Sequence, residues 1–205
     1  MGRIFVATDI HGQYSQLMLA LEHAGFSDAD RIISLGDLID RGEQSREVME
    51  FFLSRKRSGR YDIHLRGDHE QIVLDALTGD IKARRQWLEI FGGMDTLRSY
   101  GKSQNASLYE VFPIDHIKFL RETVAEYELT NYSFRHNGDG YAGDKILIYG
   151  HDHEKVAPRI EEGRINMALT QGVAILDLDS FEIWDSAGNY RDLDEKLLMG
   201  IPAGP

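Results

Sequence analysis

Residues 31–42 read RIISLGDLIDRG, a short apolar run that ends in a Gly-Asp pair and continues into Asp-Arg-Gly. Its length and its neighbouring isoleucines are typical of a buried strand. Residues 3–12, RIFVATDIHG, have the same form, since an apolar run is followed at once by aspartate, histidine and glycine. Packing alone does not require carboxylates and imidazoles where strands stop, so these ends indicate a functional site.

Two further strand ends carry the same kinds of residue. Residues 61–70 read YDIHLRGDHE, and residues 145–153 read KILIYGHDH. In open α/β sheets, ligands bind outside the carboxyl ends of the strands. The glycines allow sharp turns that bring short side chains close to one point. We therefore expect the four ends to converge in space.

The rest of the chain supplies a layered α/β frame. Helical spacing of apolar residues predicts helices at 14–24, 45–57, 70–77, 81–91 and 115–127. The later part of the chain predicts strands at 127–135, 145–149, 164–169, 173–178 and 182–185. Strands and helices alternate in the first half, and the second half is mostly strands. A sandwich whose sheets are flanked by helices fits both halves, and we expect one domain over residues 1–205.

Composition limits the chemistry. The chain has 205 residues, no cysteine and a formal net charge of -11. The lack of thiols excludes disulfides and thiolate metal sites, so any metal must be held by carboxylates, imidazoles and amides. The negative charge makes a broad nucleic-acid surface improbable. With neither a long apolar run nor an export signal, we expect a cytoplasmic protein without a membrane association.

The residue types at the strand ends suit two divalent cations. Carboxylates combined with imidazoles favour Mn, Fe or Zn over Mg or Ca, and we expect Mn. A carboxylate such as Asp37 can bridge two cations about 3.5–4 Å apart, and a water between them then ionises near neutral pH. Such a hydroxide can attack phosphorus, while a histidine protonates the leaving group and an arginine grips the phosphoryl oxygens.

The order of the motifs resembles a known family. The series DxHG, GDxxDRG, G(N)HE, a lone His and then GH is similar to that of the phosphoprotein phosphatases, a branch of the calcineurin-like metallophosphoesterases. Bacterial Ser/Thr-type protein phosphatases and symmetrical diadenosine tetraphosphatases resemble the chain most, and their likeness includes residues 87–101, WLEIFGGMDTLRSYG. The resemblance runs from about residue 3 to residue 178. It implies a four-layer αββα fold and a metal-dependent phosphatase activity.

The resemblance also implies a ligand set. It makes Asp9 and His11 ligands of one metal and Asp37 the bridge between two. Asp68 stands at the family's asparagine ligand of the second metal, and His151 at its Gly-His ligand.

The remaining roles follow from the same resemblance. His136 in YSFRHNG matches the family's last histidine ligand, and His153 is a further candidate because related enzymes use both histidines of GHxH. His69 matches the proton donor, Asp40 the carboxylate that orients it, and Arg41 a phosphate-binding arginine.

Two departures from the family pattern bear on activity. An aspartate, Asp68, replaces the family's asparagine and should lower the net positive charge of the site. Only about a dozen residues separate His136 from Gly150, where the family has an insert that carries a second phosphate-gripping arginine. We therefore expect hydrolysis of phosphate monoesters, on a phosphorylated protein or a small phosphoester. The alternatives are a dinucleoside polyphosphate hydrolase, a phosphodiesterase, or a weakly active member that binds metal or a protein partner.

Overall fold

The computed structural model describes residues 2–151, 158–161, 163–169 and 171–193. The helices of these residues are α1 (Tyr14–His23), α2 (Ser45–Arg57), α3 (Asp68–Leu77), α4 (Ile81–Glu89), α5 (Gly93–Ser99), α6 (Leu108–Val111) and α7 (Ile114–Glu122). The strands are β1 (Ile4–Ala7), β2 (Arg31–Ser34), β3 (Ile63–His64), β4 (Glu126–Glu128), β5 (Tyr132–Arg135), β6 (Ile146–Tyr149), β7 (Arg159–Glu161), β8 (Arg164–Asn166), β9 (Ala174–Asp177), β10 (Glu182–Asp185) and β11 (Tyr190–Asp192).

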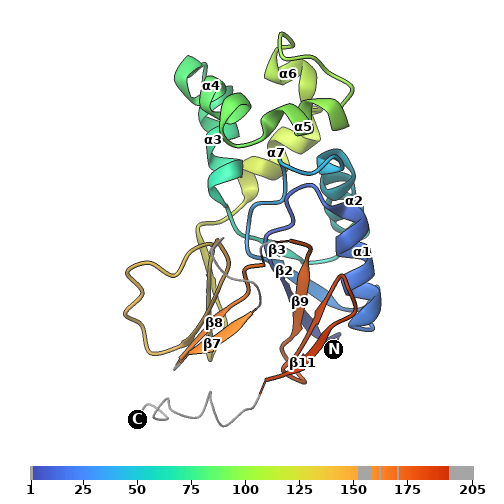
Figure 1. Ribbon diagram of the computed structural model, residues 1–205, viewed down its shortest axis with the longest axis vertical. Coiled ribbons are helices and arrows are strands. Elements are labelled where there is room, and N and C mark those ends of the chain that lie inside the picture. Colours follow the sequence, from blue (N-terminus) through green and yellow to red (C-terminus); the bar gives the residue numbers. More distant parts are fainter. Residues whose placement is uncertain (1, 152–157, 162, 170, 194–205) are drawn as a thin grey trace.

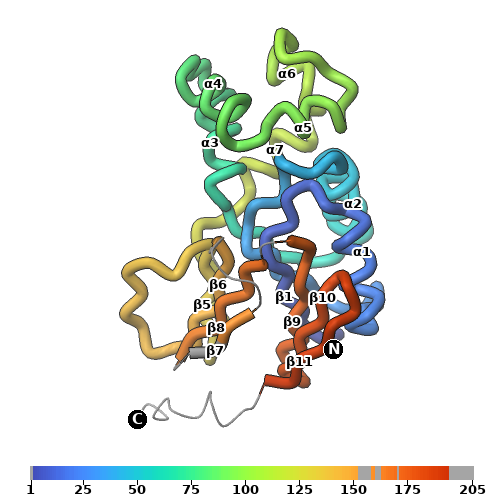
Figure 2. Tube along the Cα trace, viewed as in Figure 1, coloured from blue at the N-terminus to red at the C-terminus, as the bar shows by residue number. Residues whose placement is uncertain are grey.

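The strands form two sheets that face each other (Figures 1 and 2). The first sheet has the order β11-β10-β9-β1-β2-β3, with β1, β2 and β3 parallel. The second has the order β4-β5-β6-β8-β7, with β5, β6 and β8 parallel. The parallel strands of each sheet therefore end at a common edge, as the positions of the sequence motifs predict.

Alternation along the strands divides the core into two layers. Phe5 and Ala7 of β1 pack with the helices that cover the first sheet, whereas Val6 between them faces the second sheet. In the second sheet, Phe134 and Ile148 meet Val6 in the layer between the sheets. Since successive side chains of a strand point to opposite faces, one strand serves both layers. The predicted α/β fold, a sandwich of two sheets covered by helices, is confirmed.

The helices lie on one side and at one end of the sandwich. Helices α1 and α2 lie beside the first sheet, and α3–α7 gather beyond the end where the parallel strands stop (Figure 1). All seven helices of the described residues precede β4 in the chain. None of them is long and apolar enough to cross a bilayer.

The short connection between β5 and β6 lies against the outer face of the second sheet. Arg164 of β8 donates to the carbonyl oxygens of Gly138 (3.4 Å) and Tyr141 (3.0 Å) in this connection. Leu147, which points to the same outer face, is fully buried. The dozen residues after His136 therefore suffice to cover this part of the outer face of the sheet.

Two of the predicted elements are wrong. The helix expected over residues 115–127 ends at Glu122, because Thr123 has a φ of -59° and a ψ of 143°, and the chain then enters β4. The single strand expected over residues 127–135 is a hairpin, in which β4 pairs antiparallel with β5. The first error arises where the helix ends at Thr123, and the second at the turn between β4 and β5. Helices α5 and α6 and strands β7 and β11 were not predicted.

Candidate metal centre

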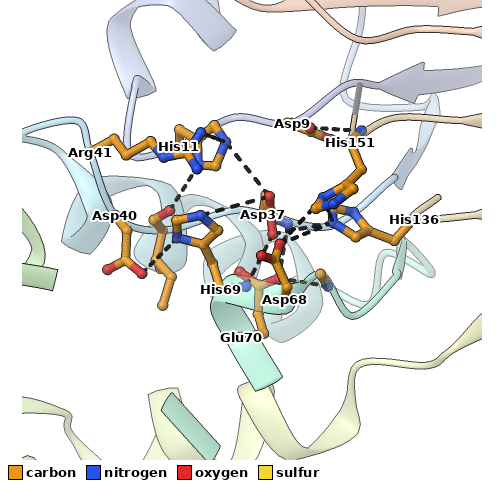
Figure 3. A network of polar contacts seen from close by, with 12 residues as sticks. Asp9, His11, Asp37, Asp40, Arg41, Asp68, His69, Glu70, His136 and His151 are labelled. Carbon is orange, nitrogen blue, oxygen red and sulfur yellow. Dashed lines mark hydrogen bonds and ion pairs between the residues drawn. The ribbon is translucent and has the colours of Figure 1, made fainter. Parts of the chain in front are cut away.

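The strand ends of the two sheets converge on one site (Figure 3). Asp9 follows β1, Asp37 follows β2, and Asp68 begins α3 shortly after β3. His136 and His151 follow β5 and β6 in the second sheet. Two hydrogen bonds join the sheets here, from the His151 N–H to Asp9 Oδ2 (3.0 Å) and from His136 Nδ1 to the Leu35 carbonyl (2.8 Å).

The backbone of the site is strained. Among the described residues, six non-glycine residues have a positive φ, and all but Phe181 belong to the site. The five are His11 (46°), Asp37 (49°), Asp40 (72°), Arg41 (64°) and His151 (62°). Such conformations cost on the order of 1–3 kcal/mol each and persist only where the surroundings impose them. Their concentration at one place points to a functional constraint.

Glycines make room for the carboxylates. A Cβ at Gly67 would lie 2.0 Å from Asp37 Oδ1, and one at Gly150 would lie 2.3 Å from Asp9 Oδ1. Both distances are shorter than atoms can approach, so the side chain of any other residue would displace the aspartate. The glycine in each motif is thus required by the side chain that it faces.

Two overlapping groups of side chains could each hold a metal ion. Their ligand atoms lie within 4.8 Å of one another, and the groups are Asp37, Asp68, His136 and His151, and His11, Asp37 and His69. Asp37 belongs to both, as a bridging ligand would. Asp9 lies in neither group, and its predicted role as a ligand stays a prediction.

The first group contains close contacts between imidazole and carboxylate groups. His136 Nε2 lies 3.3 Å from Asp68 Oδ1 and 2.9 Å from His151 Nδ1. Burial by itself would lower the pKa of His136, but Asp68 and Asp37 outweigh it and raise the pKa to about 10. The pKa of Asp68 is lowered, because the hydrogen bonds from His136 and His151 outweigh its partial burial. The carboxylates thus require positive charge at this point.

The second group is ordered by backbone contacts. His11 Nδ1 lies 3.3 Å from the carbonyl of Ile39, which directs Nε2 toward Asp37 Oδ2 at 3.6 Å. Holding one ring nitrogen on a carbonyl is the usual way to present the other to a metal. Arg41 Nη1 donates to the same His11 Nε2 at 3.1 Å, so the predicted phosphate-binding arginine lies at the edge of this group.

The residues present fit divalent cations. Asp37 Oδ2 and His69 Nε2 are buried and have no hydrogen-bond partner among the described residues. Burial, together with the negative charges of Asp9 and Glu70, raises the pKa of Asp37 well above its usual range. A cation bound to Asp37 would compensate its buried Oδ2 and the crowding of carboxylates around it, since both are costly otherwise. The donor set of oxygen and imidazole nitrogen suits Mn, Fe or Zn.

His69, a member of the second group, forms a buried pair with Asp40. His69 Nδ1 donates to Asp40 Oδ2 at 2.9 Å, and both side chains are fully buried. Asp40 is held in turn by the Trp87 indole N–H (2.9 Å) and by the Thr96 hydroxyl (2.6 Å). The sequence indicated no separate role for Trp87 or for Thr96. Both lie in the segment 87–101 that resembles the bacterial phosphatases.

Glu70 is a second residue whose role the sequence did not reveal. Its buried carboxylate accepts hydrogen bonds from the backbone N–H groups of Asp37 (2.9 Å), Leu38 (2.8 Å) and Gly67 (2.9 Å). It therefore fixes the strand ends after β2 and β3 relative to each other. Its place directly after His69 in the motif was the available signal.

The structure brings together most of the predicted site. Asp9, His11, Asp37, Asp40, Arg41, Asp68, His69, His136 and His151 all meet at this edge of the sandwich (Figure 3). His153 lies outside the described residues. The roles given to these residues stay predictions at this point.

Comparison with known proteins defines the class. Residues 2–155 match the calcineurin-like phosphoesterase family, so the chain belongs to this family of metal-dependent phosphoester hydrolases. A protein provisionally assigned as a diadenosine tetraphosphatase superposes with a TM-score of 0.64 at 17% identity, covering 89% of this chain and 91% of that one.

Two further solved structures are similar. A cold-active protein-tyrosine phosphatase of a psychrophilic Shewanella species has a TM-score of 0.65 at 15% identity, covering 95% of this chain and 81% of that one. A metallophosphoesterase from Sphaerobacter thermophilus has a TM-score of 0.56 at 16% identity, covering 94% and 88%. At these identities the likeness shows a common fold. The expected family and the expectation of a metal-dependent phosphatase are confirmed.

Proposed function

We propose that the protein hydrolyses phosphate monoesters, and that its substrate is a phosphorylated serine or threonine of a protein or a small phosphoester. The observation that carries this proposal is the buried His69–Asp40 pair at the two ligand groups that share Asp37. The ligand groups would hold two divalent cations, for which we propose manganese, and these would supply an ionised water and positive charge for the phosphoryl oxygens. Iron or zinc would suit the same donor set.

The residues of the chain have separable tasks in this proposal. His69 donates the proton that the leaving oxygen needs, from the Nε2 atom that has no hydrogen-bond partner among the described residues. Asp40 holds the Nδ1–H at 2.9 Å and so fixes the tautomer and the plane of the ring. Arg41, exposed at the edge of the site, grips the phosphoryl oxygens. The cations would be held by Asp9, His11, Asp37, Asp68, His136 and His151, with His153 as a further candidate.

The test begins with metal and a simple aryl phosphate. Protein purified without chelator should contain about two transition-metal ions per chain, and it should hydrolyse p-nitrophenyl phosphate with manganese. A His69→Ala variant should lose about 10²–10⁴ in rate if His69 is the general acid. An unchanged rate would show that His69 is not the general acid. A protein that contains no metal and gains no activity with added manganese would refute the proposal that it is an enzyme.

A dinucleoside polyphosphate hydrolase is the second candidate. A structural neighbour with that provisional assignment favours it, as does the cleft with two arginines described below. A panel of a phosphopeptide, diadenosine tetraphosphate and a phosphodiester, all with manganese, separates the candidates by their kcat/KM. Uniformly low values across the panel would favour the weakly active alternative.

A further inference from the structure

A cleft opens beside the ligand group of Asp68, His136 and His151. Its volume is about 540 Å³, and its other lining residues are Arg66, Gly67, Gln71, Ala125, Glu126, Arg135 and Asn137. This volume lies in the range of small-molecule sites and is far more than one phosphoryl group needs. The cleft therefore has room for the part of a substrate that lies beyond the scissile phosphate.

Arg66 is a fixed positive charge in this cleft. Its Nε donates to the Thr123 hydroxyl (3.0 Å), and its Nη2 donates to the carbonyls of Thr123 (2.8 Å) and Arg121 (3.2 Å). None of these partners is a carboxylate, so the charge of the guanidinium is not neutralised by them. Arg66 thus contributes a lasting positive field to the wall of the cleft.

Arg135 is held more loosely. It lies opposite Glu126 in the β4–β5 pairing, and its Nη2 lies 2.7 Å from Glu126 Oε2. The Glu126 side chain is 55% exposed, and an ion pair of this kind contributes little to stability. The guanidinium also lies over the ring of Tyr141, 5.1 Å from its centroid, while its Nε has no hydrogen-bond partner among the described residues. A ligand anion could therefore replace Glu126 at low cost.

We propose that Arg135, with Arg66 beside it, binds a second phosphate group of a small organic substrate whose first phosphate lies at the candidate metal centre; this rests on the proposed phosphoesterase function. A guanidinium group can bind two phosphate oxygens at once through its planar set of N–H donors. Asn137 adds an amide group to the lining of the same cleft. Glu126 is then an internal competitor that occupies Arg135 until the substrate arrives.

The test compares two ligands that differ by one phosphate, glucose 1-phosphate and glucose 1,6-bisphosphate. Four proteins are needed: wild type, Arg135→Gln, Glu126→Gln and, as a matched control, Glu128→Gln. Glu128 lies two residues from Glu126 on β4, but it pairs with Lys145 (2.6 Å) instead of Arg135. KM is measured with manganese by phosphate release. Dissociation constants are measured by calorimetry in a His69→Asn background, where turnover is suppressed.

The two substitutions should act in opposite directions on the bisphosphate alone. Arg135→Gln should weaken its binding about tenfold, the loss expected for one charge-assisted contact. Glu126→Gln should tighten it two- to threefold, because the competing carboxylate is gone. Glu128→Gln should change nothing, and none of the three should alter the binding of glucose 1-phosphate.

Other results would overturn the proposal. An Arg135→Gln variant that binds both ligands as wild type does, or loses both equally, removes the second phosphate site. If Arg135→Gln weakens the binding of an acidic phosphopeptide but of neither sugar phosphate, the cleft serves protein substrates instead. If Arg135→Gln fails to fold, the affinity of Glu126→Gln for the bisphosphate still tests the proposal. Turnover of glucose 1-phosphate by wild type tests the proposed function separately, since the calorimetric arm does not depend on it.

Discussion

Thr96→Val isolates the support of the proposed proton donor. The Thr96 hydroxyl donates to Asp40 Oδ1 at 2.6 Å, and both side chains are fully buried. Valine has nearly the same shape, so the substitution removes the hydrogen bond with little change in packing. The Asp40 N–H also contacts Thr96 Oγ1 (3.0 Å), but it keeps the Ser45 hydroxyl at 3.0 Å. The substitution therefore removes one contact to a charged group, together with the hydrogen bond between the Ser45 and Thr96 hydroxyls (2.9 Å).

The expected magnitude follows from that count. A hydrogen bond to a charged group contributes about 1.5–3 kcal/mol, so the free energy of unfolding should fall by about that amount. Trp87 and His69 still hold Asp40, so the carboxylate should move only slightly. Removing such an outer contact should cost about 10–100-fold in activity through the orientation of His69.

The assays are urea unfolding at pH 7.5 and hydrolysis of p-nitrophenyl phosphate with manganese. Thr96→Ser is the control, because it keeps the hydroxyl and removes only a methyl group. It should retain most of the activity. If Thr96→Val has wild-type stability and rate, the hydroxyl does not support Asp40. If the serine and valine variants lose the same amount, packing and not the hydrogen bond is responsible.

Three further predictions concern stability, metal content and rate. Burial lowers the pKa of His64 to about 4 from 6.5 in the unfolded chain, so the unfolded state binds more protons below pH 6.5. His64 should therefore cost about 2 kcal/mol of stability between pH 7.5 and 5, and His64→Gln should abolish that loss in urea unfolding. Gly150→Ala, whose Cβ would lie 2.3 Å from Asp9 Oδ1, should lower metal content by elemental analysis; an undiminished content would show that Asp9 can move. Asp68→Asn should raise kcat with manganese, because it reduces the negative charge of the site; no gain would make Asp68 a competent ligand.

Local sequence signals were sufficient for the strand ends. The runs at 3–12 and 31–42 each combine a short apolar segment with a glycine and an aspartate, and β1 and β2 end at these places. His136 also lies beside another predicted ligand, since its Nε2 is 2.9 Å from His151 Nδ1. The direction of a strand determines where its last residues lie. A motif at the end of a strand therefore predicts a position in three dimensions.

Contacts between distant segments could not be read from local signals. Trp87 is 47 residues from Asp40, and Thr96 is 56 residues from it, yet both bond its carboxylate. An indole at helical spacing looks like a core residue, and Trp87 is one, because it is completely buried as well. The hairpin of β4 and β5 was missed because no glycine marks the turn between its two strands.

The site and the joint between the two sheets are the same structure. Elsewhere the sheets meet through apolar side chains such as Val6 and Phe134. At the carboxyl ends they meet through His136 on the Leu35 carbonyl and through the His151 N–H on Asp9. Cations held by Asp37 from one sheet and by His136 from the other would bind only the folded chain, and so would stabilise it. The strained backbone at Asp37 and His151 is tolerable for the same reason, because both sheets hold the strand ends in place.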